Sequence, residues 1–183
     1  MMSYPRNDLL NPTLKKVLET FKLDKNYIQG EGSYLTDDTG IRYLDFIAQY
    51  GAVPFGYNPD FAWDALEEVR KKGLPSLVQP SLPGEALKLA NILAEVSPGD
   101  LCYATFCQSG TEAVEAAIKL ARSKTGREMI VSTTNSFHGK TLGALSATGN
   151  NSYQTPFRAP APGFIKAPYN DIDALGRIFE LPF

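Results

Sequence analysis

A glycine-containing turn between an apolar run and a long amphipathic stretch constrains the fold of this chain most. The turn Gln108-Ser109-Gly110-Thr111 ends the apolar residues 101–107 and precedes a helical pattern that continues to residue 122. The pattern predicts a strand, a tight turn and a helix in succession. The first main-chain N–H groups of a helix lack partners within it, and the helix dipole places partial positive charge there. The turn is therefore a candidate phosphate site.

Each residue of this turn has a candidate role. Glycine at position 110 allows an oxygen to approach the main chain closely, and we expect the hydroxyls of Ser109 and Thr111 to be two further donors. A purely structural interpretation stands beside this one. In it Ser109 caps the helix, Gly110 forms the turn, and Glu115 and Lys119 form a helical ion pair. Such turns are common in α/β folds, so the turn alone leaves both interpretations open.

A second polar cluster follows the next apolar run. Phe137 and His138 lie just beyond the predicted strand at residues 129–132. The ring of Phe137 is suited to stacking on a planar ligand, with His138 in the adjacent loop. The alternative is a core phenylalanine and a structural, hydrogen-bonded histidine. Together the two clusters favour a planar, phosphorylated cofactor.

Composition excludes several other classes of function. The chain has 183 residues, 43% of them hydrophobic and 21% charged, with a formal net charge of -2. This suffices for a globular core but provides no basic stripe for nucleic acid. No apolar window is long enough for a membrane span, and residues 1–10 lack the apolar core of a signal peptide. We therefore expect a cytoplasmic protein.

Histidine and cysteine are too few and too scattered for a multi-histidine or zinc site. His138 is the only histidine, and the two cysteines are Cys102 and Cys107. Their odd spacing in the predicted strand directs their side chains to opposite faces. We therefore expect neither a disulfide nor a zinc site, and unpaired cysteines suit a reducing cytoplasm.

The order of predicted elements indicates an α/β fold with a mainly parallel sheet, because parallel strands need crossover connections of this length. The N-terminal part predicts a helix that starts at Asn11-Pro12 and a hairpin around residues 37–40, and Asn58-Pro59 repeats the helix-start signal. Further elements are predicted as helices at residues 61–69, 83–96 and 172–179, strands at 101–107, 129–132 and 164–167, and an irregular excursion at 150–163. The sheet domain has about three strands where open sheets usually have about four to six, so we expect it to be incomplete.

Longer strings within these clusters carry a family resemblance. They are SGTEA at residues 109–113, EAAIKLA at 115–121 and SFHGKTLGALS at 136–146. With them the chain is similar to the N-terminal portion of the class III, fold type I aminotransferases that depend on pyridoxal 5'-phosphate (PLP). Within that family it most resembles the putrescine, ornithine and acetylornithine enzymes.

The resemblance implies a fold and an assembly. Residues 1–60 would be the N-terminal helix and hairpin segment of the small domain, and residues 61–183 a truncated N-terminal part of the large PLP-binding α/β domain. Family active sites lie at a subunit interface, so the complete protein would be a homodimer. It would take a small-molecule amine and a 2-oxo acid.

The resemblance also assigns residues. Gly110 and Thr111, with Ser109 beside them, would hold the cofactor phosphate, and Phe137 would stack on the pyridine ring next to His138. Lys140 stands where the acetylornithine branch commonly has an arginine that contacts the substrate carboxylate in a bidentate manner. Val114 replaces an asparagine frequent in that branch. These two differences favour a diamine or another ω-amine, such as putrescine or ornithine, as the amino donor.

The catalytic residues of the family lie outside these 183 residues. The family's Schiff-base lysine and the aspartate that pairs with the pyridine nitrogen belong to a later region. Motif context disfavours Lys119 and Lys140 as substitutes, so we predict no catalytic residue in this chain. Two alternatives remain: a non-catalytic fragment or interaction module that needs a complementary partner chain, and a generic phosphate-binding module.

Overall fold

The computed structural model describes residues 11–75, 78 and 80–181. The chain divides into two compact units, Met1–Val78 and Gln79–Phe183. The prediction about a signal peptide at residues 1–10 lies outside the described residues. In the part that is described, no helix is long and apolar enough to cross a membrane. The predicted domain boundary at residue 60 stays a prediction.

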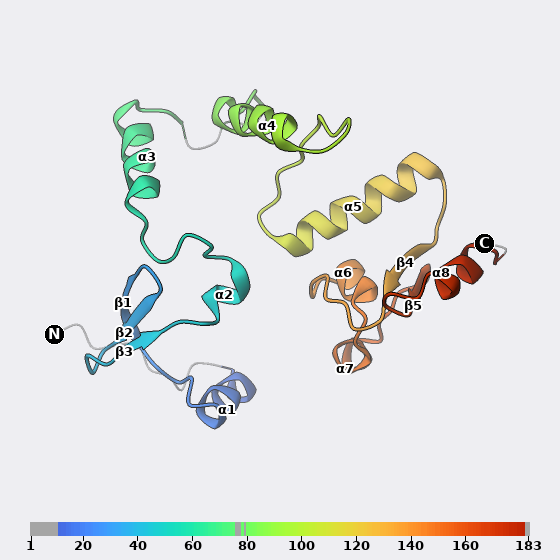
Figure 1. The fold of residues 1–183 in the computed structure, drawn as a ribbon, viewed down its shortest axis with the longest axis horizontal. Coiled ribbons are helices and arrows are strands. Elements are labelled where there is room, and N and C mark those ends of the chain that lie inside the picture. Colours follow the sequence, from blue (N-terminus) through green and yellow to red (C-terminus); the bar gives the residue numbers. More distant parts are fainter. Residues whose placement is uncertain (1–10, 76–77, 79, 182–183) are drawn as a thin grey trace. The chain divides into compact units, whose positions relative to one another are not determined.

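The first unit contains a three-stranded antiparallel sheet in the order β1-β2-β3 (Figure 1). The predicted hairpin is confirmed, because β2 and β3 pair through Tyr34 opposite Leu44. The first strand, β1, was not predicted. The elements are α1 (Pro12–Thr20), β1 (Tyr27–Glu31), β2 (Tyr34–Asp37), β3 (Arg42–Leu44), α2 (Ala48–Gly51) and α3 (Asp60–Lys71).

A buried aspartate organises the turn of this hairpin. The Asp37 carboxylate accepts hydrogen bonds from the Thr39 hydroxyl at 2.6 Å, the Tyr43 hydroxyl at 2.8 Å and the Ile41 main-chain N–H at 2.9 Å. These bonds, that of Thr39 above all, lower the pKa of Asp37 to about 2. The carboxylate therefore replaces main-chain acceptors that the turn cannot supply.

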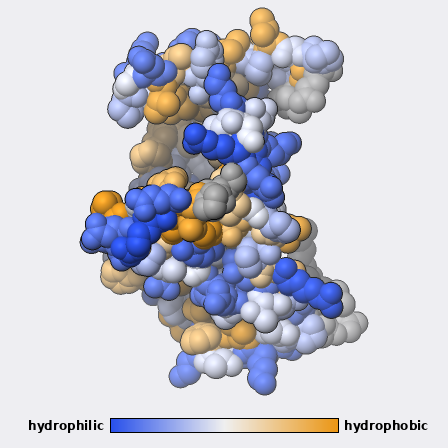
Figure 2. Space-filling view, turned by 90° about the vertical axis from the view of Figure 1, so that its right-hand side faces the viewer, coloured by the Kyte–Doolittle hydropathy of each residue, from blue (hydrophilic) through white to orange (hydrophobic). Residues whose placement is uncertain are grey.

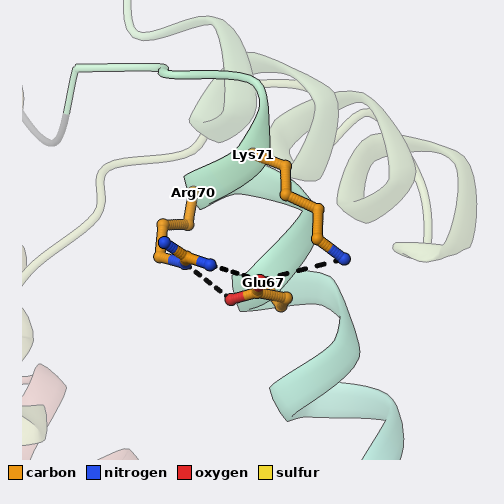
Figure 3. Close-up of polar contacts among 3 residues, drawn as sticks. All are labelled: Glu67, Arg70 and Lys71. Carbon is orange, nitrogen blue, oxygen red and sulfur yellow. Dashed lines mark hydrogen bonds and ion pairs between the residues drawn. The ribbon is translucent and has the colours of Figure 1, made fainter.

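The helix starts follow local signals only in part. Asn11 caps α1 as predicted, with its side chain accepting from the N–H groups of Thr13 and Leu14. Asn58 does not cap α3, because its side-chain amide donates to the Gly30 carbonyl at 2.7 Å. The surface of α3 carries a local ion-pair cluster in which Glu67 contacts both Arg70 and Lys71 (Figure 3). The hydrogen bond from Arg70 lowers the pKa of Glu67.

The second unit contains the predicted parallel pairing. Strand β4 pairs with β5 in parallel, with Ile130 opposite Phe164 and Thr133 opposite Ala167. The α/β alternation is thus confirmed for this pair. The elements are α4 (Gly84–Val96), α5 (Gly110–Thr125), β4 (Ile130–Thr133), α6 (Leu142–Ala147), α7 (Asn151–Gln154), a 3₁₀ turn (Thr155–Phe157), β5 (Phe164–Ala167) and α8 (Ile172–Phe179).

Two predictions for this unit are wrong. Residues 101–107 form no strand and are exposed, because no strand in the described residues pairs with them. Cys102 and Cys107 are free as expected, yet not for the predicted reason of opposite strand faces. The region 150–163 is not wholly irregular, since the Asn150 side chain caps the short helix α7.

The core of the second unit is built mainly from small side chains. Most of its buried apolar residues belong to α6, β5 and α8, and they are Ala144, Leu145, Ala147, Ala167, Ala174 and, from α5, Ile118. Many large apolar side chains elsewhere remain exposed, and hydrophobic groups reach the surface among hydrophilic ones in Figure 2. Close packing of the described residues is therefore concentrated around α6.

Lys166 lies against the C-terminal end of α6. Its ammonium group donates to the Ser132 hydroxyl at 2.7 Å and to the main-chain carbonyls of Ser146, at 2.7 Å, and Ala147. Partial burial lowers its pKa from 10.5 to about 8. The lysine thus satisfies carbonyls that the helix itself leaves without partners.

We predict that Lys166 makes the chain more stable as the pH rises from about 8 towards 10.5. In this range the unfolded chain holds a proton at residue 166 that the folded chain has released, so the free energy of unfolding increases with pH. The test compares urea unfolding of the parent and the Lys166→Met variant, followed by circular dichroism. Other titrations occur in both chains and cancel in the difference. The prediction would be contradicted if the free energy of unfolding of the parent, minus that of the variant, stayed constant or fell as the pH rose.

Candidate functional site

The N-terminus of α5 carries unpartnered main-chain donors. Ser109 caps the helix, since its hydroxyl oxygen accepts a hydrogen bond from the Glu112 N–H at 3.4 Å. The same hydroxyl donates a hydrogen bond to the Glu112 carboxylate at 2.9 Å. Ala113 N–H bonds to the Ser109 carbonyl at 3.0 Å. The main-chain N–H groups of Gly110 and Thr111 have no partner in the described residues. These two groups can bind an anion.

The side-chain hydroxyls of this turn are already engaged. The Thr111 and Thr141 hydroxyl oxygens lie 2.8 Å apart, and the Thr141 hydroxyl donates to the Glu115 carboxylate at 2.6 Å. A carboxylate only accepts, so Thr141 uses its proton there and Thr111 must donate to Thr141. The Ser109 proton is used by Glu112. In this structure both hydroxyls donate within the protein, so the donors that remain free belong to the main chain, and phosphate binding by Ser109 and Thr111 stays a prediction.

Glu115 connects α5 to the start of α6. Its Oε1 atom accepts from the Thr141 hydroxyl and from the main-chain N–H groups of Gly143, at 2.8 Å, and Ala144, at 3.1 Å. These bonds, the one from Thr141 first, lower the pKa of Glu115. The predicted helical ion pair with Lys119 does not form. Glu115 instead satisfies the N-terminus of α6, which Thr141 does not cap with its own side chain.

Two glycines allow this close approach. Gly139 is buried with φ of 132°, and a Cβ atom there would collide with the Thr111 side chain. A Cβ atom at Gly143 would collide with the Glu115 carboxylate. Gly139 therefore lets the loop that precedes α6 contact α5 directly, and Gly143 does the same for α6 itself.

This loop presents the two other predicted site residues. Phe137 is 62% exposed, which contradicts the alternative of a core phenylalanine. Its ring meets the edge of Tyr153 at a centroid distance of 6.5 Å. The main-chain N–H of His138 donates to the buried Thr148 hydroxyl at 3.0 Å. The loop is thus anchored by its main chain, and the Phe137 ring is available to a ligand.

A shallow cavity of about 370 Å³ lies between α5 and β4. Its lining is mainly apolar and consists of Val114, Ala117, Ile118, residues 130–133, His138 and Ala147. Lys140 is exposed and has no hydrogen-bond or ion-pair partner in the described part of the chain. No group of three or more potential metal ligands occurs among the described residues.

Sequence reasoning missed Glu115 and Thr141 as organising residues. Glu115 lies four positions after Thr111, so both side chains lie on one face of the helix. Thr141 directly precedes the short helix α6. These local signals were present, but the contact joining them spans 26 residues of sequence. From the sequence, an ion pair with Lys119 on the same helix was the simpler interpretation of Glu115.

The sequence profile of the family Aminotransferase class-III matches residues 19–177. Aminotransferase PigE of Serratia sp. (strain ATCC 39006) is 38% identical over 92% of this chain and 20% of its own length. The acetylornithine aminotransferase of Streptococcus mutans is 38% identical over 84% of this chain and 39% of its own.

Solved structures agree with this match. The omega transaminase from Pseudomonas jessenii in complex with PMP superimposes with a TM-score of 0.75 and 25% identity, over 90% of this chain and 37% of that one. The chain thus spans less than two thirds of the proteins it matches. The parallel pairing of β4 and β5 belongs to a fold type I transferase domain.

We predict that Gly139→Ala destabilises the second unit by about 2 kcal/mol or more, whereas Gly110→Ala does not. The added methyl group at position 139 meets Thr111 and a strained φ, while at position 110 it meets nothing within 4 Å. The measurement is urea unfolding of both variants beside the parent. Equal stabilities of the two variants would show that Gly139 is not constrained by its contact with α5.

Proposed function

The chain belongs to the class-III aminotransferase family, and from this premise we propose that it supplies phosphate and ring contacts for PLP in an enzyme that transfers amino groups. Enzymes of this family depend on PLP. The observation that carries the proposal is the pair of unpartnered N–H groups at Gly110 and Thr111, together with the exposed ring of Phe137 on the loop that contacts α5.

The residues present fit such a cofactor. The approach to Gly110 is open, because even an added Cβ atom would meet nothing within 4 Å. A helix N-terminus with two free donors suits a phosphate dianion. The exposed face of Phe137 suits an aromatic ring.

The chain's own residues would bind and orient the cofactor. Gly110 and Thr111 donate main-chain hydrogen bonds to the phosphate, Ser109 fixes the helix start, and Phe137 covers one face of the ring beside His138. When bound, PLP supplies an electron-withdrawing ring that stabilises negative charge at the amine-bearing carbon of the substrate. Precise anchoring of the phosphate limits how far the ring can turn relative to that carbon.

The proposed donor is a diamine or an ω-amino acid such as putrescine or ornithine, and the acceptor a 2-oxo acid. Lys140 is exposed and unpaired in the described part of the chain, and its ammonium is a point charge without the planar fork of arginine. It therefore favours no bidentate carboxylate contact. Val114 lines the mainly apolar cavity, where valine fits better than the polar asparagine of the acetylornithine branch.

The complete enzyme is proposed to be a homodimer in the cytoplasm. Large apolar side chains such as Leu120 and Phe157 are more than 60% exposed, and a second subunit would remove such surface from water. The division into residues 1–60 of the small domain and 61–183 of the large domain is part of the same proposal.

A second candidate is a non-catalytic module that needs a complementary chain. The extended, exposed residues 101–107 favour it, since their main-chain groups lack a sheet partner in the described residues. The two candidates differ in whether the chain recognises the cofactor.

We predict that the chain binds pyridoxamine 5'-phosphate at least about tenfold more tightly than pyridoxamine, because charge-assisted bonds to the phosphate contribute about 1.5–3 kcal/mol each. These ligands lack the aldehyde and cannot react with surface lysines. Isothermal titration calorimetry measures both affinities. Thr111→Val should leave the ratio within about threefold, since the Thr111 proton is engaged by Thr141. Equal binding of the two ligands would favour the second candidate.

The donor prediction is tested with the complete enzyme and its Lys140→Arg variant. Arginine restores a bidentate carboxylate contact, so the kcat/KM for N-acetylornithine relative to putrescine should rise by about tenfold. The assay follows 2-oxoglutarate-dependent consumption of each amine. An unchanged ratio would mean that residue 140 does not contact the donor.

A further inference from the structure

Glu115 is not assigned a role by the proposed function, yet it lies at the centre of the site's contacts. We propose that Glu115 is a positioning residue of the cofactor site, which holds the loop bearing Phe137 and His138 against the N-terminus of α5 through Thr141 and α6. This inference rests on the proposed function. It makes the phosphate half and the ring half of the site one rigid unit.

The first step is the junction between the helices. The Oε1 atom of Glu115 accepts hydrogen bonds from the Thr141 hydroxyl and from the N–H groups of Gly143 and Ala144, at 2.6, 2.8 and 3.1 Å. Thr141 also contacts Thr111, the second residue of α5. A single carboxylate oxygen therefore fixes both the end of the loop and the phosphate-binding turn.

The second step carries this constraint along α6 to the loop. The buried Thr148 hydroxyl at the end of α6 lies 3.1 Å from the Ala144 carbonyl and 3.2 Å from the Gly139 carbonyl. The same hydroxyl accepts from the His138 N–H at 3.0 Å. Because Ala144 and Thr148 are buried, the loop is held to the helix from inside the core.

The third step is the chemistry of the acceptor. The Oε2 atom of Glu115 makes no hydrogen bond in the described residues, and all three bonds use Oε1. A glutamine at this position retains an oxygen acceptor of the same reach. An alanine removes it and leaves two α6 N–H groups and the Thr141 hydroxyl without their partner. The two substitutions therefore separate the acceptor from the negative charge.

The test measures two ligands that use different parts of the site. Pyridoxamine 5'-phosphate engages the turn and the loop together, whereas inorganic phosphate engages the turn alone. Glu115→Ala should weaken pyridoxamine 5'-phosphate by about tenfold, because its two contacts are no longer held at a matched separation. The affinity for inorganic phosphate, measured by ³¹P NMR, should stay within about twofold of that of the parent chain, since the Gly110 and Thr111 N–H groups remain.

Two further variants and a control complete the design. Glu115→Gln should retain pyridoxamine 5'-phosphate affinity within about threefold. Thr141→Val removes only the Thr141 hydroxyl and its hydrogen bonds. It should lower the affinity for pyridoxamine 5'-phosphate by about threefold without lowering the affinity for inorganic phosphate. Glu95 is an exposed acid on α4, outside the site, and the Glu95→Ala variant should bind both ligands as the parent does.

The outcomes distinguish the two proposals. A parent chain that binds neither ligand overturns the proposed function and this inference with it. If the parent binds but Glu115→Ala binds pyridoxamine 5'-phosphate equally well, only the role of Glu115 is overturned. Equal losses for both ligands in Glu115→Ala would mean a general structural role, which also overturns positioning. If Glu115→Ala does not fold, Thr141→Val decides, and parent-like affinities there overturn the inference.

Discussion

The hydrogen bonds of Glu115 to the start of α6 are the interaction on which the second unit most depends. A helix of six residues is too short to be stable through its own hydrogen bonds. Its N-terminal N–H groups are satisfied by an acid from α5, and its last carbonyls by Lys166 from β5. The acid lies at the positive end of the helix dipole, so its charge stabilises α6, whereas the lysine contributes hydrogen bonds to the carbonyls at the other end. The core of the unit forms around this helix.

Local signals predicted the elements whose boundaries depend on local chemistry. The last helix, α8, has the predicted bounds, and α1 starts at the predicted Asn11 cap. The strand predicted at residues 101–107 was wrong because a strand is not a local structure. Its main-chain N–H and C=O groups need a neighbouring strand as a partner. The helix-start signal at Asn58 failed for a related reason. Its side-chain amide donates to the Gly30 carbonyl, 28 residues away, and does not cap the helix. The errors thus occur where a distant partner decides the conformation.

The same distinction separates the predicted from the unpredicted parts of the site. The free N–H groups at Gly110 and Thr111 follow from the start of a helix and need no tertiary contact. The direction of a hydroxyl proton is different. The Thr111 hydroxyl donates a hydrogen bond to Thr141 only because the Thr141 hydroxyl already donates to Glu115. These contacts join residues that lie 26 to 30 positions apart in the sequence. No local pattern contains that information.

This division has a consequence for how the site recognises its ligand. Phosphate recognition by main-chain N–H groups does not depend on which side chain occupies those positions, provided the helix starts at Gly110 and its approach stays open. In the proposed function, recognition of the amino donor depends instead on a side chain, that of Lys140, and its exchange for arginine changes the geometry of the charge. The proposed cofactor turn and the proposed donor residue can therefore change independently. For this reason the short strings around α5 and α6 identify the family, whereas the amino donor stays a proposal.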